Sequence, residues 1–353
     1  MSETISNFSN FNLRYGSCLP NPGFGTWRCD ETKLQEAVYK AISCGYRHID
    51  CAQLYKNEHI VGKAIAQSIN DGIIKNRQEL FITGKLAPSQ MQSESVYPAL
   101  DKSLKDLFGD IKLTDNSESP FYFDLFITHW PYSIDPSNTI SPAPFSARRG
   151  YTPLAFLNVW RELERAVDDG RVRALGVSNM SAFKIQTLCG SARIQPSCLQ
   201  VELHPFLAQN SLVRFCKRRG IVVTGYSPLG SPGRPAAYRT EDDPDVLSAA
   251  CILEIASRLK KTPAQIALRW AVQRGTVPLP RSTTLSRIEE NFEGAIGGSG
   301  LSSWYLNDSD MAAINALDQT DGSKGRIMKG DNFACENIDW KKLWDEDFID
   351  MEE

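Results

Sequence analysis

Four side chains that could handle a proton lie at or just beyond the ends of short apolar runs: Asp50, Tyr55, Lys85 and His129. The runs are typical of β-strands and are YRHID (46–50), LFITG (80–84) and DLFIT (124–128). A parallel barrel brings the carboxyl ends of its strands together at one mouth. We therefore expect these four side chains to meet in one site, although they are far apart in the sequence.

An acid, a phenol, an ammonium and an imidazole at one mouth suit the donation of a proton to a substrate oxygen. A tyrosine has an unperturbed pKa of about 10, and a nearby ammonium favours the phenolate, so we predict that Lys85 lowers the pKa of Tyr55. Asp50 would hold Lys85 charged and oriented, and His129 would direct a ring N–H at the same oxygen. The set suits reduction of a carbonyl group, although each residue taken alone is also compatible with a structural role.

The second half of the chain offers polar groups that suit a dinucleotide. Ser178, Asn179 and Gln200 end two further strands, and their hydroxyl and amide groups can bind the carboxamide of a nicotinamide. Tyr226 could stack on the nicotinamide ring, and the turn SPLGS (227–231) could present backbone N–H groups to a pyrophosphate. Guanidinium groups, hydroxyls and a helix N-terminus suit a phosphate monoester, and they come together at Arg281, Ser282, Thr283 and Arg287.

Strand-like and helix-like segments alternate along the chain. We expect strands at 22–25, 46–51, 80–84, 124–128, 173–177, 198–202, 221–225 and 277–280. Helical spacing of apolar residues follows each strand, at 31–44, 57–69, 95–107, 154–168, 181–189, 209–218, 246–259 together with 263–273, and 286–293. Eight such units predict an α/β protein, a (β/α)₈ TIM barrel with eight parallel strands. A doubly wound open sheet is the competing architecture, but it usually carries GxGxxG after its first strand, and none is present.

We expect a single barrel domain over residues 1–353, with the barrel at about 20–320 and a C-terminal loop and tail at 321–353. Long loops should lie at the C-terminal face. The segment 130–153 is rich in Pro and Ser and is predicted to be such a loop. The stretch 110–119 is predicted to be an insertion on the opposite face.

Composition and charge narrow the classes of function. A net charge of −3 argues against a nucleic-acid partner. No apolar run approaches the length of a membrane span, and the N-terminus lacks the apolar stretch of a signal peptide. The nine cysteines include no CxxC pair, so we interpret them as reduced thiols of a cytoplasmic protein. Only four histidines are present, and they form no evident metal-ligand set, so we expect no metal: His48, His59, His129 and His204.

The sequence resembles the aldo-keto reductases. The motifs that carry the resemblance are GFGTW (23–27), GYRHIDCAQLYKNE (45–58), ITGKL (82–86), LFITHWP (125–131), LGVSN (175–179), LQVELHP (199–205), GYSPLGS (225–231) and PRSTTLSRIEEN (280–291). The resemblance implies NADPH-dependent reduction of an aldehyde or ketone, an aldose included, with NADH as a weaker alternative. It implies a catalytic set in which Tyr55 is the acid, with Asp50, Lys85 and His129. It implies cofactor contacts from Thr26, Asp50, Ser178, Asn179, Gln200, Tyr226, Ser227, Leu229, Ser231, Arg281, Ser282, Thr283, Arg287, Glu290 and Asn291, and substrate contacts from Trp27, Tyr55, His129 and Trp130.

Three departures from the family pattern bear on specificity. Arg281 replaces a common lysine but keeps the charge that a 2′-phosphate needs. Ala87 stands where many members carry a tryptophan, so we expect a wider substrate pocket. The tail does not match the usual C-terminal loop closely.

Two alternatives to a reductase remain open at this point. The first is a non-catalytic NADP(H)-binding protein on the same fold, which the intact set of four catalytic residues disfavours. The second is a metal-dependent barrel hydrolase, which the four histidines disfavour. The partner expected of a reductase is a small carbonyl compound, and the chain would act as a monomer or homodimer.

Overall fold

Eight parallel strands form the centre of the protein. The computed structural model describes residues 10–109, 121–135, 137–138, 147–234, 243–298, 303–319 and 325–328. The strands are β3 (Gly23–Gly25), β4 (His48–Asp50), β5 (Phe81–Leu86), β6 (Leu125–Thr128), β9 (Leu175–Ser178), β10 (Cys198–Glu202), β11 (Val222–Tyr226) and β12 (Val277–Pro278), and they pair in this order. The backbone N–H of Gly25 donates to the carbonyl of Pro280 at 3.0 Å, which connects β3 to the segment directly after β12. The predicted (β/α)₈ barrel is therefore confirmed.

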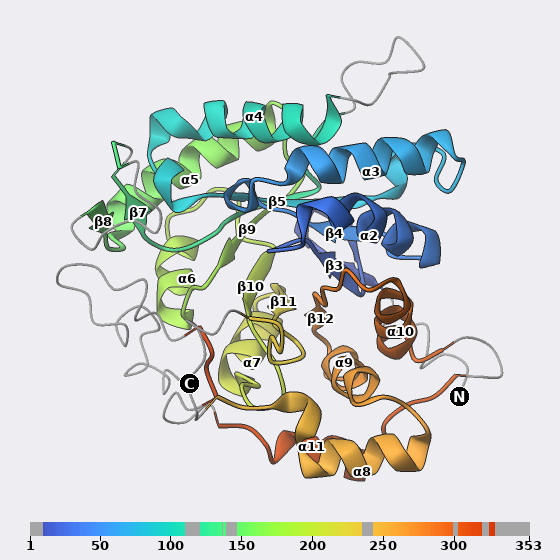
Figure 1. Cartoon of the computed structure of the whole chain (residues 1–353). Coiled ribbons are helices and arrows are strands. Elements are labelled where there is room, and N and C mark those ends of the chain that lie inside the picture. The colour runs from blue at the N-terminus through green and yellow to red at the C-terminus, as the bar shows by residue number, and fades with distance from the viewer. Residues whose placement is uncertain are drawn as a thin grey trace.

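Helices surround the strands (Figure 1). They are α2 (Glu31–Cys44), α3 (Glu58–Asn70), α4 (Val96–Phe108), α5 (Pro153–Asp168), α6 (Ala182–Cys189), α7 (Asn210–Arg218), α8 (Ala250–Leu259), α9 (Pro263–Gln273), α10 (Leu285–Ile296) and α11 (Asp308–Asn315). Each strand leads into a helix at the positions predicted to within a few residues. The stretch predicted as one helix at 246–259 is instead a short 3-10 turn, Val246–Ser248, followed by α8, because Ala249 has an extended backbone with ψ of 128°.

Local capping explains where two of these helices begin and end. The Asp30 carboxylate accepts the backbone N–H of Thr32 at the start of α2, and Gly45 ends that helix with a φ of 117° that favours glycine. Before α9, the Thr262 hydroxyl accepts the N–H of Gln265, and the Gln265 side chain accepts the N–H of Thr262. These reciprocal bonds form the capping box of α9.

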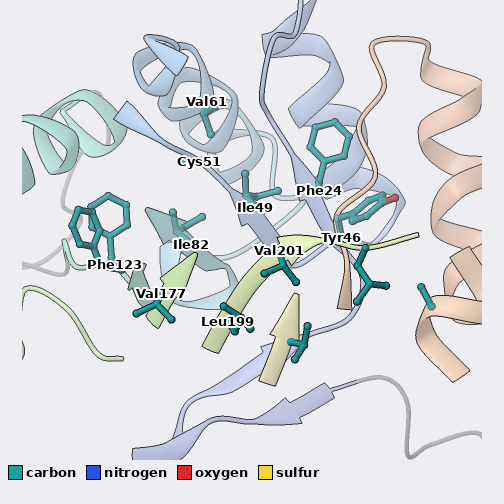
Figure 2. Packing of buried hydrophobic residues seen from close by; sticks show 14 of the residues in the cluster. Phe24, Tyr46, Ile49, Cys51, Val61, Ile82, Phe123, Val177, Leu199 and Val201 are labelled. Carbon is teal, nitrogen blue, oxygen red and sulfur yellow. The ribbon is translucent and has the colours of Figure 1, made fainter. Parts of the chain in front are cut away.

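Successive side chains of each strand point alternately outward, into the core between strands and helices, and inward, into the barrel. Phe24, Ile49 and Ile82 are paired across β3, β4 and β5, and their side chains belong to the large cluster that includes the helix side chains (Figure 2). The residues between them point the other way: the His48 imidazole meets the Thr83 hydroxyl at 2.9 Å inside the barrel. Polar side chains at the carboxyl ends of the strands therefore face the interior, at one end of it.

A hairpin that the sequence did not predict closes the other end. Strands β1 (Asn10–Asn12) and β2 (Cys18–Pro20) pair antiparallel. Leu13 and Leu19 pack there against Phe81, Leu125 and Val277, and these three residues stand at the amino ends of their strands. The hairpin thus forms a floor for the barrel, on the face away from Asp50 and Lys85.

Other parts of the chain differ from expectation or lie outside the described residues. Within the predicted loop 130–153, β7 (Ser133–Ile134) and β8 (Arg148–Arg149) form a small antiparallel pair. Helix α11 was not predicted. The insertion 110–119 and most of the tail lie outside the described residues. All cysteines in the described part are free thiols, and none of its helices is long and apolar enough to span a membrane.

Candidate active site

The structure brings the four predicted catalytic residues together at the carboxyl end of the barrel. Asp50 ends β4, Lys85 lies near the end of β5, and His129 directly follows β6. Tyr55 ends a short 3-10 helix, Gln53–Tyr55, that follows β4. A cavity of about 650 Å³ opens over them, and Asp50, Tyr55 and His129 are part of its wall.

Lys85 lies under the cavity and uses all of its donors. The ammonium donates to the Asp50 carboxylate at 2.5 Å, to the Cys51 carbonyl at 2.9 Å and to the Tyr55 hydroxyl oxygen at 3.2 Å. An ammonium has three N–H groups, so none is left for a substrate. Because Lys85 donates to the Tyr55 oxygen, the Tyr55 proton must point elsewhere, and the cavity lies on its open side.

The predicted lowering of the Tyr55 pKa is wrong. Removal from water raises the pKa of Tyr55 to about 12, and this effect outweighs the opposing charge of Lys85. Burial by itself disfavours the charged form of Lys85, but the Asp50 carboxylate and the Tyr55 oxygen together more than compensate, and the pKa of Lys85 is raised. The Asp50 carboxylate also opposes part of the effect of the Lys85 charge on Tyr55. Tyr55 therefore keeps its proton at neutral pH.

His129 presents a neutral ring to the cavity. Burial, assisted by the charge of Lys85, holds the pKa of His129 well below its usual range. Its ring stands edge-on to the Tyr55 ring, with centroids 5.6 Å apart. The His129 main chain is fixed on both sides, because its N–H donates to the Leu86 carbonyl and its carbonyl accepts the Asn179 side-chain amide. A neutral imidazole has one ring N–H to donate.

The predicted nicotinamide-binding side chains are oriented by one another. Gln200 donates its amide to Asp50 at 2.8 Å, so its carbonyl oxygen is the free end. Asn179 donates to the Ser178 hydroxyl oxygen at 3.1 Å and accepts the Tyr226 hydroxyl at 2.9 Å. The Ser178 hydroxyl, acting as an acceptor there, keeps its own proton to donate. All four residues belong to the cavity wall.

The far end of the cavity combines a turn and a helix N-terminus. After β11, the backbone of Ser227, Gly230 and Ser231 is left-handed, with φ of 53°, 72° and 47°. Such a turn can present successive N–H groups to an anion. Across from it, Arg281 donates to the Arg28 carbonyl at 3.1 Å. The predicted residues that line this end are Ser227, Leu229, Ser231, Arg281, Ser282, Thr283, Arg287, Glu290 and Asn291.

Two sequence expectations do not fit the cavity. Thr26 is buried and its hydroxyl donates to the Asp50 carbonyl at 2.8 Å, so it supports Asp50 and is absent from the cavity wall. Ala87 is also buried and absent from that wall, so its small side chain does not widen the pocket. It begins the turn Pro88–Gln90, and β7 packs against this turn.

Several wall residues were not predicted. Leu54, next to Tyr55, is about half exposed and lines the mouth together with the predicted Trp27 and Trp130. Met328 reaches the cavity from the tail, where no periodicity marked it. Thr262, Pro263 and Ala264 at the start of α9 line the other end, and their helix-start pattern was the one signal that placed them. Among the described residues, no cluster of three potential metal ligands occurs.

Comparisons with known proteins agree with this geometry. The profile of the aldo/keto reductase family matches residues 21–318. An aldo/keto reductase of Synechocystis is 37% identical over 344 residues, which cover 97% of this chain and 98% of that protein. The human aldo-keto reductase family 1 member A1 is 38% identical, over 87% of this chain and 88% of its own.

A solved structure supports the same assignment. The aldose reductase from Schistosoma japonicum superposes with a TM-score of 0.74 at 32% identity, over 88% of this chain and 93% of its own. The family match covers most of the chain, and the relatives match nearly their full length. The protein therefore belongs to the aldo/keto reductase family and is an oxidoreductase of carbonyl and alcohol groups.

Proposed function

We propose that the protein reduces an aldehyde or ketone to the alcohol, with NADPH as the reductant and Tyr55 as the proton donor. The observation that carries the proposal is that all three N–H groups of the Lys85 ammonium are hydrogen-bonded within the protein. Because all three are occupied and one is on the Tyr55 oxygen, the phenolic O–H is free to donate into the cavity beside His129. A carbonyl oxygen placed between these two groups would accept two hydrogen bonds.

Lys85 and Asp50 act on the charge that remains after proton donation. When the proton leaves, the Tyr55 oxygen becomes negative, and the Lys85 N–H already directed at it stabilises that charge. Asp50 keeps the ammonium in place. His129 stays neutral, so it can donate a hydrogen bond without competing as an acid.

The free polar atoms of the cavity fit a nicotinamide dinucleotide. The Gln200 carbonyl oxygen and the Ser178 hydroxyl supply an acceptor and a donor, which match the two functions of a carboxamide. The Tyr226 ring is held by its bond to Asn179. When bound, a reduced nicotinamide would supply the hydride to the carbonyl carbon. The left-handed turn after β11 suits the pyrophosphate, and Arg281 and Arg287 at the start of α10 favour NADPH over NADH.

Apolar side chains of the described residues contribute to the cavity wall that Tyr55 and His129 also line. Trp27, Leu54, Trp130 and Met328 line it beside Tyr55 and His129. A carbonyl compound with an aromatic or aliphatic body would cover these apolar side chains favourably when it binds. A free sugar is disfavoured, because its hydroxyls would lose their hydrogen bonds to water at such a wall. We therefore place apolar aldehydes ahead of aldoses as substrates.

The test of the proposal is the substitution Tyr55→Phe. It should lower kcat for an aromatic aldehyde by at least roughly 10²-fold, because it removes the acid. The dissociation constant for NADPH should change less than about twofold, because the ring remains. Tyr97→Phe is the matched control, since the Tyr97 hydroxyl bonds Asp169 on the outer surface. Wild-type turnover near zero would favour the non-catalytic alternative, and full turnover in Tyr55→Phe would remove Tyr55 as the acid.

A further inference from the structure

One buried carboxylate near the cavity has no part in the chemistry proposed above. Glu202 ends β10 and is fully buried. One of its oxygens accepts the backbone N–H of Ile327 at 2.9 Å, and the other accepts the N–H of Met328 at 2.8 Å. The His204 imidazole lies 3.0 Å from the first oxygen. A barrel residue therefore binds the main chain of the C-terminal segment with both oxygens.

The segment Gly325–Met328, here called the C-terminal strap, is also fitted to the barrel by shape. A Cβ on Gly325 would lie 1.8 Å from the carbonyl oxygen of Phe206, so a side chain at this position requires the backbone to move. The same carbonyl accepts the N–H of Gln319 at 3.0 Å. Three residues after Gly325, Met328 forms part of the cavity wall. The strap belongs to no helix or strand, so its place depends on tertiary contacts, of which these are two.

The surroundings of Glu202 favour its ionised form, which is the form that can accept hydrogen bonds on both oxygens. Burial alone would raise the pKa of Glu202, but the bond to His204, the charge of Arg326 and the N–H of Met328 outweigh burial, and the pKa is lowered. An ionised carboxylate accepts on both oxygens, and bonds from N–H groups to such a charge are shorter and stronger than neutral ones.

We infer that Glu202 is a positioning residue that holds the C-terminal strap on the barrel, so that Met328 completes the apolar wall of the substrate site. This inference rests on the proposed function for its effect on substrates, but not for the strap contact itself. Glu202 does not touch the reacting atoms described above. Its loss should therefore weaken substrate binding far more than it slows the reaction of bound substrate.

The first test is Glu202→Gln, which replaces one accepting oxygen by an amide that cannot accept an N–H. Hydrogen exchange at the amides of Ile327 and Met328 should become faster. KM for a bulky aromatic aldehyde should rise by roughly 10-fold, with kcat and the NADPH dissociation constant changed less than about threefold. Glu164→Gln is the matched control, because the buried Glu164 likewise accepts a backbone N–H, that of Ile194 at 2.8 Å, and is absent from the cavity wall.

A second variant keeps the test decisive if Glu202→Gln folds poorly. Gly325→Val should displace the strap and give the same rise in KM, and the double variant should add nothing to it. Unchanged exchange at Ile327 and Met328 in Glu202→Gln would show that Glu202 does not hold the strap. Faster exchange with an unchanged KM would show that the strap is not part of the substrate site. Exchange needs no turnover, so failure of the proposed reaction would be visible separately, in Tyr55→Phe.

Discussion

At the scale of single residues, the site depends on which hydrogen-bonding groups are already occupied. Lys85 has no free donor, Gln200 has one free end, and Tyr55 keeps its proton. The types of residue at the strand ends do not tell which of their donors and acceptors are already paired with each other. They also cannot show how completely Tyr55 is removed from water, and this burial is the main reason why the pKa of Tyr55 is raised and not lowered, with a smaller contribution from the Asp50 charge.

The raised pKa of Tyr55 predicts a flat pH profile for reduction. An acid works while it is protonated, so Tyr55 is active below its pKa of about 12, and His129 is neutral because its pKa is lowered. The value of kcat/KM for reduction should therefore be constant from about pH 6 to about pH 10. Measurement of initial rates with one uncharged aldehyde tests this. A decline with a midpoint of about pH 8 to 9 would restore the sequence-based view that Lys85 makes Tyr55 more acidic.

Glu58 predicts a pH-dependent stability. It is buried at the start of α3, one oxygen accepts the Ser103 hydroxyl at 2.9 Å, and the other has no partner. Burial raises the pKa of Glu58 to about 7, against about 4.3 in an unfolded chain. Between these two pH values the folded state binds a proton that the unfolded chain has lost, so stability should fall as pH rises from about 4.3 to about 7, by about 3–4 kcal/mol in total.

The substitution Glu58→Gln isolates this contribution. A neutral amide can still accept the Ser103 hydroxyl but carries no buried charge. The variant should gain about 3 kcal/mol over the wild type at pH 8 and little at about pH 4.5. Denaturant midpoints at the two pH values measure the difference. An equal shift at both would mean that the charge of Glu58 is not the cause.

At the scale of elements, the parts that sequence predicted are those with a local signal. The helices predicted at 31–44 and 263–273 follow from the spacing of apolar residues within those segments, and α2 and α9 have the same bounds. Strands β1 and β2 are short, and no α-helix follows either of them before β3, so the strand–helix alternation did not indicate them. Their place depends on Leu19 meeting residues from distant strands, so the chain alone did not reveal them. The misplacement of Ala87 has the same origin: whether a strand-end residue reaches a cavity depends on what packs against it.

The start of α10 gives a prediction about the cofactor. Arg281 and Arg287 line the cavity and are the residues that we propose for binding the 2′-phosphate, and Arg281 is held by the Arg28 carbonyl. Arg287→Ala should weaken NADPH by about 10- to 100-fold, since a charge-assisted contact is worth roughly 1.5–3 kcal/mol, and should leave NADH nearly unchanged. Quenching of protein fluorescence measures both dissociation constants. Arg165→Ala, on the exposed face of α5, is the control, and equal losses for both cofactors would show that Arg287 does not bind the extra phosphate.

At the scale of the whole molecule, the hydrophobic packing that closes one end of the barrel is far from the candidate catalytic residues at the other end. The floor residues Leu13 and Leu19 pack at the amino ends of the strands, whereas Asp50, Lys85 and His129 stand at the carboxyl ends. The eight strands between them form one nearly closed sheet, and the bond from Gly25 to Pro280 connects its two ends. We therefore expect that one end can lose packing without moving the side chains at the other.

This separation predicts the effect of Leu19→Ala. Leu19 is fully buried, so the substitution should leave a cavity and lower the free energy of unfolding by about 2–5 kcal/mol. In the folded protein, kcat/KM and the NADPH dissociation constant should remain within about twofold of the wild type, because the cavity forms at the floor. Leu253→Ala, at an exposed position on α8, should change stability by less than about 0.5 kcal/mol. A loss of activity in Leu19→Ala at temperatures where it is fully folded would mean that the floor and the mouth of the barrel are coupled.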